Sequence, residues 1–276
     1  MTRRKRTMRT LLTYTLLIVV ILIWAFPVLW VFLTSLKPRT AIFTSPPTLF
    51  FLPTLDHYQE ALGTHGILSS ITNSLIITVG STMLAVLVAV PAAYAYARLR
   101  FRLKTTLSFY TLFMQMAPPI GLLIPYFFIL NRLRLLDSYL GMIVIYLTFT
   151  IPFSVWIMIT YFQDVPREME EAATVDGASR FGAFARIVLP QVRGGVAVTA
   201  IFAFINAWSE FLYAVVLTGP DTQTATVAIF SFLAAEESRW GPFTATGVMI
   251  MAPVVAVALV AQRQIVHGLS LGGVKG

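Results

Sequence analysis

The chain has 276 residues, of which 57% are hydrophobic and only 12% are charged, and its formal net charge is +8. Soluble globular domains carry about 25% charged residues, so this composition excludes an ordinary soluble core and indicates a protein whose apolar surface faces lipid. Because no polar stretch is longer than roughly 40 residues, there is no room for a soluble catalytic or nucleotide-binding domain of about 50 residues or more. The absence of cysteine excludes disulfides and thiolate chemistry.

Six apolar runs long enough to cross a bilayer follow one another along the chain. The first follows a basic N-terminus and is longer than the core of a signal peptide, so we expect an uncleaved span. The sequence therefore predicts an all-α integral membrane protein with a single transmembrane domain over residues 1–276. The predicted spans are residues 11–33, 71–97, 105–130, 139–162, 195–217 and 243–266.

Prolines mark both the first long connection and several of the spans. Residues 34–70 hold four prolines, which favour turns and extended backbone, although the pattern near residues 57–62 is compatible with a short amphipathic helix. The adjacent Pro118 and Pro119 fall inside the third predicted span, next to Gln115. Broken membrane helices often line transport cavities, which would suit a gate here, but prolines are also common in ordinary membrane helices.

The lysines and arginines are distributed unequally between the two sides of the predicted bundle. Fifteen fall on one side, namely five before the first span, four in residues 98–104, four in residues 163–194, and Arg263 with Lys275 at the end of the chain. The other side has five. The positive-inside rule then predicts that both termini and residues 163–194 are cytoplasmic.

The connection at residues 163–194 has the pattern of two short helices. Pro166 fits a first helical turn, glutamates follow where the helix dipole favours anions, and Gly177 supplies a left-handed stop. One face of the first helix, over residues 166–176, is slim enough to enter a groove on another protein. That face consists of Met169, Ala172, Ala173 and Asp176, and the second helix has an apolar face of Phe181, Phe184 and Val188 for packing on the bundle.

Four strings, one of them in this connection and three elsewhere in the chain, carry a resemblance. The first is Glu171-Ala172-Ala173, three residues, Gly177, nine residues, then Ile187-x-Leu189-Pro190. The others are Ile151-Pro152-Phe153, Trp208-Ser209-Glu210-Phe211-Leu212, and the ending Gly268-Leu269-Ser270-Leu271-Gly272-Gly273-Val274-Lys275-Gly276. The first string resembles the EAA loop of permeases from binding-protein-dependent ABC importers. Together the strings are similar to the shorter permease subunit of maltose-type, carbohydrate-importing systems, which implies a type I ABC importer permease fold.

The resemblance also implies partners in the bacterial cytoplasmic membrane. A second homologous permease subunit would complete the pore, an ATPase homodimer would bind ATP and Mg, and an extracytoplasmic solute-binding protein would deliver a sugar, polyol or glycerol-phosphate compound. The chain itself would then bind no cofactor and catalyse no reaction. The implied ATPase-coupling residues are Glu168, Met169, Glu171, Ala172, Ala173, Asp176, Gly177, Ile187, Leu189 and Pro190, with a contacting tail of Gly272, Gly273, Val274 and Lys275.

Glu210 is the sole acidic residue inside a predicted span, and a carboxylate there is costly unless it faces water or a partner group. In a continuous helix it would share a face with Asn206, Ser209 and Tyr213. That face, with Gln115, is a candidate translocation path. The alternative is that Glu210 ties this helix to a neighbour.

Two other classes of membrane protein compete with this interpretation. A free-standing secondary transporter or channel would need a coupling-ion site, which usually requires intramembrane charge pairs or inverted repeats, and neither is evident. A membrane-embedded enzyme would need a catalytic cluster, and no span offers one. No histidine lies at metal-ligand spacing from another ligand, so no metal site is expected. The basic residues follow the membrane pattern, and we expect no nucleic-acid binding.

Overall fold

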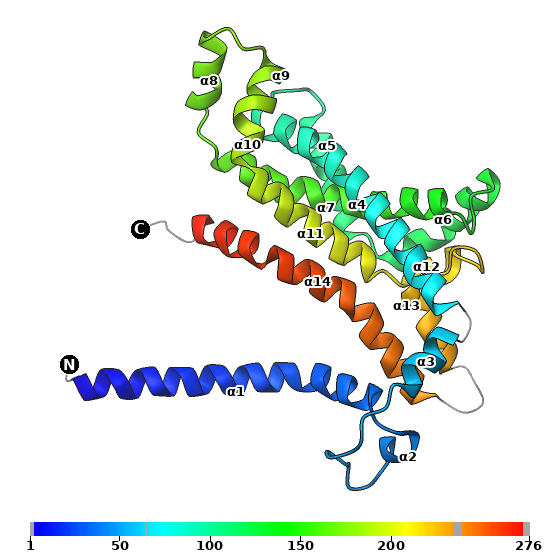
Figure 1. Ribbon diagram of the computed structural model, residues 1–276. Helices are drawn as coiled ribbons and strands as arrows, with labels where there is room; N and C mark the ends of the chain where they lie inside the picture. Colours follow the sequence, from blue (N-terminus) through cyan, green and yellow to red (C-terminus); the bar gives the residue numbers. More distant parts are fainter. Residues whose placement is uncertain (1–2, 64–65, 234–238, 273–276) are drawn as a thin grey trace. The chain divides into compact units, whose positions relative to one another are not determined.

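The computed structural model describes residues 3–63, 66–233 and 239–272, which form helices and connecting segments without a β-strand (Figure 1). The predicted all-α fold is confirmed. The helices are α1 (Arg3–Ser35), α2 (Arg39–Ile42), α3 (Asp56–Gly63), α4 (Ile67–Arg98), α5 (Lys104–Met116), α6 (Pro119–Leu133), α7 (Tyr139–Asp164), α8 (Glu168–Val175), α9 (Arg180–Ala183), a π-helix (Phe184–Val188), α10 (Leu189–Gln191), α11 (Arg193–Trp208), α12 (Leu212–Leu217), α13 (Ala225–Ala228), a 3₁₀ helix (Ile229–Phe232) and α14 (Trp240–Gly272).

The chain divides into two compact units by its internal contacts. Met1–Ile67 and Ile229–Met251 form the first unit, and Leu68–Ala228 with Ala252–Gly276 form the second. The second holds both of the regions that the sequence singles out, the candidate path and the connection at residues 163–194.

The first unit contains the long apolar helix α1 and the proline-rich connection that follows it. The most apolar stretch of α1, within Thr10–Ser35, buries none of its residues inside the chain. Such a surface suits lipid or an apolar partner helix. Lys37, directly after α1, is 2% exposed, and its Nζ lies 4.6 Å from the centre of the Trp30 ring, a cation–π contact that compensates part of the charge burial.

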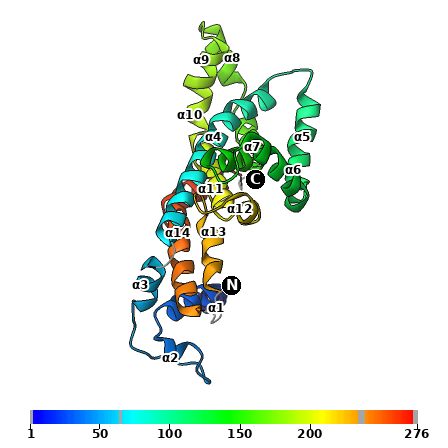
Figure 2. The same cartoon turned by 90° about the vertical axis from the view of Figure 1, so that its right-hand side faces the viewer.

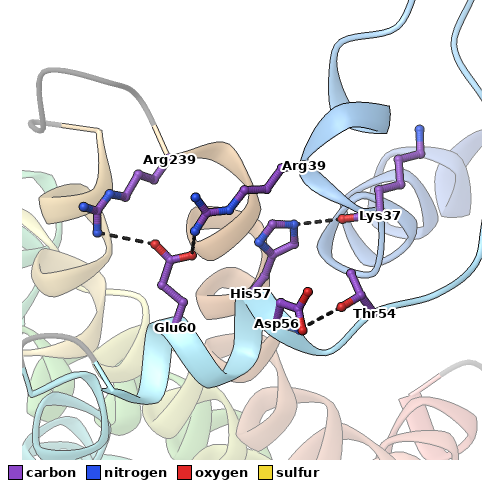
Figure 3. A network of polar contacts seen from close by, with 7 residues as sticks. All are labelled: Lys37, Arg39, Thr54, Asp56, His57, Glu60 and Arg239. Atoms are coloured by element: carbon purple, nitrogen blue, oxygen red, sulfur yellow. Dashed lines mark hydrogen bonds and ion pairs between the residues drawn. The ribbon is translucent and has the colours of Figure 1, made fainter.

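A cluster of ion pairs closes the first unit around α3 (Figure 3). The Glu60 carboxylate on α3 binds the guanidinium groups of Arg39, at 2.5 Å, and Arg239, at 3.4 Å. One turn earlier on α3, the buried His57 ring lies 2.8 Å from the Lys37 carbonyl oxygen through Nε2. A side chain at Gly241 would overlap this ring, since an added Cβ would fall within 2.2 Å of it. The short helix expected near residues 57–62 is thus present and ties distant segments together.

The second unit is built on the close packing of α4, α7 and α11. Buried residues of α4 and α7, such as Ala89, Ala93, Met158 and Phe162, form one core cluster with the π-helix. Helix α11 approaches α7 closely because Gly195 faces the Tyr161 ring, which an added Cβ would meet at 2.4 Å. Small residues at membrane-helix interfaces permit this kind of backbone approach.

Four helices are long and apolar enough to cross a membrane singly, and two bent pairs bring the number to six in the described residues. The single helices contain the predicted spans 11–33, 71–97 and 139–162 and, in α14, residues 243–260 of the last one. The predicted span 105–130 corresponds to a bent pair, because α5 and α6 meet at 103°. Ala117 and Pro118 are extended there, since a residue before proline avoids the helical region and Pro118 offers no N–H.

The predicted span 195–217 is also not one helix. Helix α11 ends at Trp208, and α12 begins at Leu212 after a non-helical stretch. At 1.5 Å per residue, the 16 residues of α11 extend about 24 Å, which is short of the roughly 30 Å bilayer core. Helix α11 instead forms the second bent pair, at 74°, with the Arg180–Gln191 segment.

The last helix is longer than the sequence predicts. Helix α14 continues to Gly272, so residues 267–272, which follow the last predicted span, are helical. The tail residues Gly273, Val274 and Lys275 lie outside the described part of the chain, and their predicted contact with an ATPase stays a prediction.

Candidate functional site

The break between α5 and α6 and the break between α11 and α12 meet at a cavity with polar and apolar walls. This cavity has a volume of about 200 Å³ and lies between the end of α5, the start of α6, α7, and the α11–α12 break. Four of the five predicted path residues line it. The lining consists of Met114, Gln115, Ala117, Pro119, Leu122, Tyr126, Thr148, Phe149, Asn206, Glu210 and Tyr213.

Glu210 caps the second half of the broken helix. Its carboxylate oxygens accept hydrogen bonds from the backbone N–H groups of Tyr213, at 2.8 Å, and Ala214, at 3.1 Å. The Tyr146 hydroxyl donates to the same carboxylate at 3.3 Å. These N–H groups would otherwise be unsatisfied at the start of α12, and the positive end of the helix dipole faces the negative charge. The hydropathy pattern predicts that Glu210 lies inside a span, whereas its carboxylate stabilises a break between α11 and α12.

Aromatic rings form one wall of the cavity. The Tyr213 ring lies 5.5 Å from that of Tyr126 and stacks on Phe149 at 6.1 Å, with 21° between the planes. Together with the amides of Gln115 and Asn206, these rings offer flat apolar faces beside hydrogen-bonding groups. Such a mixture can bind a polar solute that also has an apolar face. Ser209, the fifth predicted path residue, is exposed and does not line the cavity.

The second candidate region is the connection at residues 163–194, which we call the coupling loop. Figures 1 and 2 show its helices α8 and α9 side by side, at the opposite end of the second unit from α12 and α13. Helix α8 begins at Glu168, two residues after Pro166, with three glutamates in its first turn. Gly177 follows it with φ of 89°, the left-handed conformation that the sequence predicts. The Ser179 hydroxyl then accepts the N–H of Gly182 and caps α9.

Three of the four residues of the predicted docking face of α8 are exposed, and one is buried. Ala173 is 8% exposed and packs toward its own chain, whereas Met169, Ala172 and Asp176 are exposed. The outward face also includes Val175, which is 87% exposed. The remaining predicted loop residues Glu168, Glu171 and Pro190 are exposed, and Ile187 and Leu189 are half-buried.

The segment after α8 is less regular than predicted. A π-helix, Phe184–Val188, separates α9 from α10 within the segment expected to be one helix. Pro190 follows directly and lacks the N–H that regular helical bonding requires. Phe184 and Val188 are buried as predicted, but Phe181 is 76% exposed and does not anchor the loop.

Sequence reasoning missed the side chains that hold α8 to the membrane helices. Arg98 and Tyr94, at the end of α4, both bind the Glu170 carboxylate on α8. In the sequence, Arg98 is only one of the four basic residues in residues 98–104. The one available signal was its position directly after an apolar span, where a basic residue is ordinary.

A carboxylate outside the predicted spans was also missed. Asp137 precedes α7 and accepts hydrogen bonds from the backbone N–H groups of Gly219, at 2.8 Å, and Thr222, at 2.9 Å, and from the Thr222 hydroxyl at 2.6 Å. Burial alone would raise the pKa of Asp137, but these bonds and one from the Asp221 N–H outweigh it and lower the pKa below its ordinary value. Asp137 thereby fixes the segment that follows α12.

Comparison with known proteins gives a consistent family assignment. Residues 85–270 match the family described as the binding-protein-dependent transport system inner membrane component. The chain is 35% identical to the probable ABC transporter permease protein y4oR of Sinorhizobium fredii, over 98% of this chain and 97% of that protein. It is 36% identical to the trehalose transport system permease protein SugB of Mycobacterium tuberculosis, over 91% of this chain and 92% of that one.

A solved structure shares the fold. One chain of the crystal structure of a bacterial ABC transporter involved in import of the acidic polysaccharide alginate matches with a TM-score of 0.77 and 23% identity. The match covers 95% of this chain and 98% of the other. At this identity the likeness concerns the fold alone.

Proposed function

Because the chain belongs to the family of inner-membrane components of binding-protein-dependent transport systems, we propose that it is the permease subunit through which an ABC importer moves a sugar or sugar-like solute into the cytoplasm. The observation that carries the proposal is the cavity at the two helix breaks, in a multi-pass membrane protein of this family. Its amide groups and stacked rings suit hydroxyl-bearing solutes with one apolar face. The relative that transports trehalose supports a carbohydrate as the solute.

A second homologous permease subunit completes the pore in this proposal. The cavity of about 200 Å³ is smaller than typical ligand pockets of roughly 300–1,000 Å³ and can hold only part of an oligosaccharide. Facing walls from a partner helix bundle would enlarge it. The exposed apolar surface of α1 is suited to contact with such a partner or with lipid.

The energy comes from an ATPase homodimer that docks on the exposed face of α8. The small side chain of Ala172, the exposed Val175 and the acidic first turn suit a helix that enters a groove on another protein. ATP and Mg bind to that partner, and this chain binds no cofactor and serves as a non-catalytic transport subunit. An extracytoplasmic binding protein delivers the solute, as the family description indicates.

The orientation follows from the charge distribution. Fifteen of the 20 lysines and arginines lie on the side of the coupling loop, which supports a cytoplasmic position for both termini and that loop. The membrane is then the bacterial cytoplasmic membrane, and the breaks at Glu210 and Pro118 lie within the bilayer.

Affinity purification from native membranes tests the proposal. The tagged full-length chain should retain one ATPase and one further permease in stoichiometric amounts, which mass spectrometry would identify. Purification of the chain without an ATPase or a second permease, together with solute uptake by that purified chain alone in proteoliposomes, would favour the free-standing transporter and overturn the proposal.

A further inference from the structure

Helix α4 joins two polar contact points within the second unit. Along its axis, Asn73 and Arg98 lie about 37 Å apart at 1.5 Å per residue. Figures 1 and 2 show α4 extending from the region of α12 and α13 to that of the coupling loop. One helix therefore contacts both the segment beyond the cavity and the helix assigned to the ATPase.

The first contact point fixes α4 to the segment after α12. The Asn73 amide donates to the carbonyl oxygens of Asp221, at 3.2 Å, and Gln223, at 3.1 Å. The Ser74 hydroxyl accepts the N–H of Ala225 at 2.8 Å. Both side chains are buried, at 6% and 4% exposure. A displacement of the segment that follows Glu210 and α12 therefore acts directly on α4.

The second contact point fixes α4 to the coupling loop. Arg98 Nε donates to Glu170 on α8 at 2.5 Å, and its Nη2 donates to the Val165 carbonyl oxygen at 2.5 Å. The Tyr94 hydroxyl donates to the other oxygen of Glu170 at 2.9 Å. The Arg98 side chain is 7% exposed and that of Glu170 15%. One guanidinium thus holds both the start of the loop and the first turn of α8.

Between these points α4 is continuous and closely packed. The helix has no break from Ile67 to Arg98, although it contains Pro91. Ala85, Ala89 and Ala93 are fully buried, and the latter two lie in the core cluster with α7. The buried alanine face, packed against α7, restricts bending of α4 between these points.

We propose that Arg98 is a positioning residue that transmits movement between the cavity and α8, with α4 as the rigid connection. The proposal rests on the proposed function, because it assigns α8 to the ATPase. A short segment around Pro166 joins α7 to α8, and by itself it would leave the orientation of α8 free to vary. The fork geometry of Arg98 removes this freedom, since its two nitrogens fix two points of the loop.

Replacement of Arg98 should let the orientation of α8 vary, while the coupling loop keeps its fold. Tyr94 also packs on Phe184 of the π-helix, with ring centres 4.6 Å apart, and on Phe162 of α7 at 5.6 Å. This aromatic contact survives in Arg98→Gln. The variant should therefore assemble with its partners but transmit movement poorly.

The first measurement is the number of solute molecules imported per ATP hydrolysed by the reconstituted complex. In Arg98→Gln this ratio should fall about tenfold, the factor expected for loss of a charged hydrogen bond, with ATPase copurification retained. Arg98→Lys can replace only one of the two bonds and should be intermediate. Glu170→Gln should resemble Arg98→Gln, and the double variant should be no worse than either single one. Arg100→Gln, a neighbouring exposed arginine without an ion pair in the described residues, is the control.

The second measurement is independent of transport. Spin labels at Thr174→Cys on α8, away from the docking face, and Met83→Cys on α4, both exposed positions in a cysteine-free chain, report the distance between the helices in the assembled complex. The distance distribution should be narrow with Arg98 present and broader with Arg98→Gln. If the wild-type complex imports solute while Arg98→Gln changes neither the ratio nor the distribution, the inference is overturned and the proposed function stands. If the wild-type complex shows no ATP-dependent import, the proposed function itself fails.

Discussion

At the scale of single residues, the structure assigns Glu210 a role that its isolation in an apolar segment could not specify. A carboxylate inside the membrane needs water or a polar partner. The sequence allows two roles for Glu210 that meet this need: a residue of the translocation path, or a hydrogen-bonded tie to a neighbouring helix. The contacts show the tie to another helix, and the path role stays a proposal. Glu210 binds the start of α12 and the Tyr146 hydroxyl of α7, and it also lines the cavity.

Replacement of Glu210 should therefore reduce both stability and transport. Glu210→Ala leaves two N–H groups of α12 without their acceptor, at a cost of about 1–3 kcal/mol per buried group. Glu210→Gln keeps one acceptor oxygen and should be milder. Thermal unfolding and solute uptake of the reconstituted complex provide the measurement, with the exposed carboxylate of Asp221 as the matched control. Equal uptake and complex yield in Glu210→Ala and Asp221→Ala would refute a special role for Glu210.

Asp137 should make the stability of the second unit depend on pH in the acidic range. Its pKa is lowered in the folded protein, so the carboxylate stabilises the fold above its ordinary pKa of 3.8, and this contribution is lost as pH falls through the lower folded value. At pH 7, Asp137→Asn should unfold at a lower temperature than wild type. The difference should shrink as the pH falls below about 4. A difference that stays constant or grows between pH 7 and pH 3 would contradict the assignment, and Asp221→Asn serves as the control.

At the scale of helices, the coupling loop shows what the spacing of residues in the sequence can and cannot predict. The glycine stop at Gly177 follows from local backbone preferences and is present. The outward face of α8 depends on what the helix packs against, and that is a tertiary property. Helical spacing places Ala172 and Ala173 on one broad face. It therefore cannot predict which of the two is exposed and which is buried against the chain.

Tryptophan substitutions at these two alanines should have different consequences. Ala172→Trp adds a ring to the exposed face, so the chain should fold normally and lose ATPase copurification. Ala173→Trp forces a ring into a buried position, and overpacking of this kind typically costs about 1–3 kcal/mol of the chain's own stability. Thermal unfolding of each variant and the yield of copurified ATPase distinguish the two effects. Normal copurification with Ala172→Trp would exclude this face of α8 as the docking surface.

The two helix breaks at the cavity could be predicted from the sequence only in part. The Pro118-Pro119 pair signals a kink, but the 103° angle depends on how α5 and α6 pack. The Glu210 break lacks such a signal, because hydropathy summed over residues 195–217 describes a continuous span. The same limit applies to Arg98, whose partner Glu170 lies 72 residues further along the chain. Pairings of this kind are not encoded in local periodicity.

At the scale of the whole molecule, composition and hydropathy were sufficient to identify a multi-pass helical membrane protein, and the loop string with its flanks was sufficient to identify the family. Both follow from properties spread along the chain rather than from any one contact. The side on which the coupling loop lies follows from charge alone and stays a prediction.

Cysteine labelling tests that orientation. Val175→Cys on α8 and Phe50→Cys in the connection after α1 are both highly exposed positions, at 87% and 98%, in a chain without native cysteine. A membrane-impermeant thiol reagent applied to intact spheroplasts should label position 50 and leave position 175 unlabelled until the cells are opened. Labelling of position 175 from outside would reverse the topology and remove α8 from the ATPase.

The central claim is that this chain forms part of an ATP-driven sugar importer, and uptake into proteoliposomes tests it most directly. Vesicles that contain the purified complex, with the binding protein outside and ATP inside, would be offered labelled di- and oligosaccharides, including trehalose. The account predicts accumulation that requires both enclosed ATP and the ATPase subunit and that does not respond to an imposed proton or sodium gradient. Accumulation of the same sugar without ATP or without the ATPase, driven by an ion gradient, would contradict the account and identify a secondary transporter.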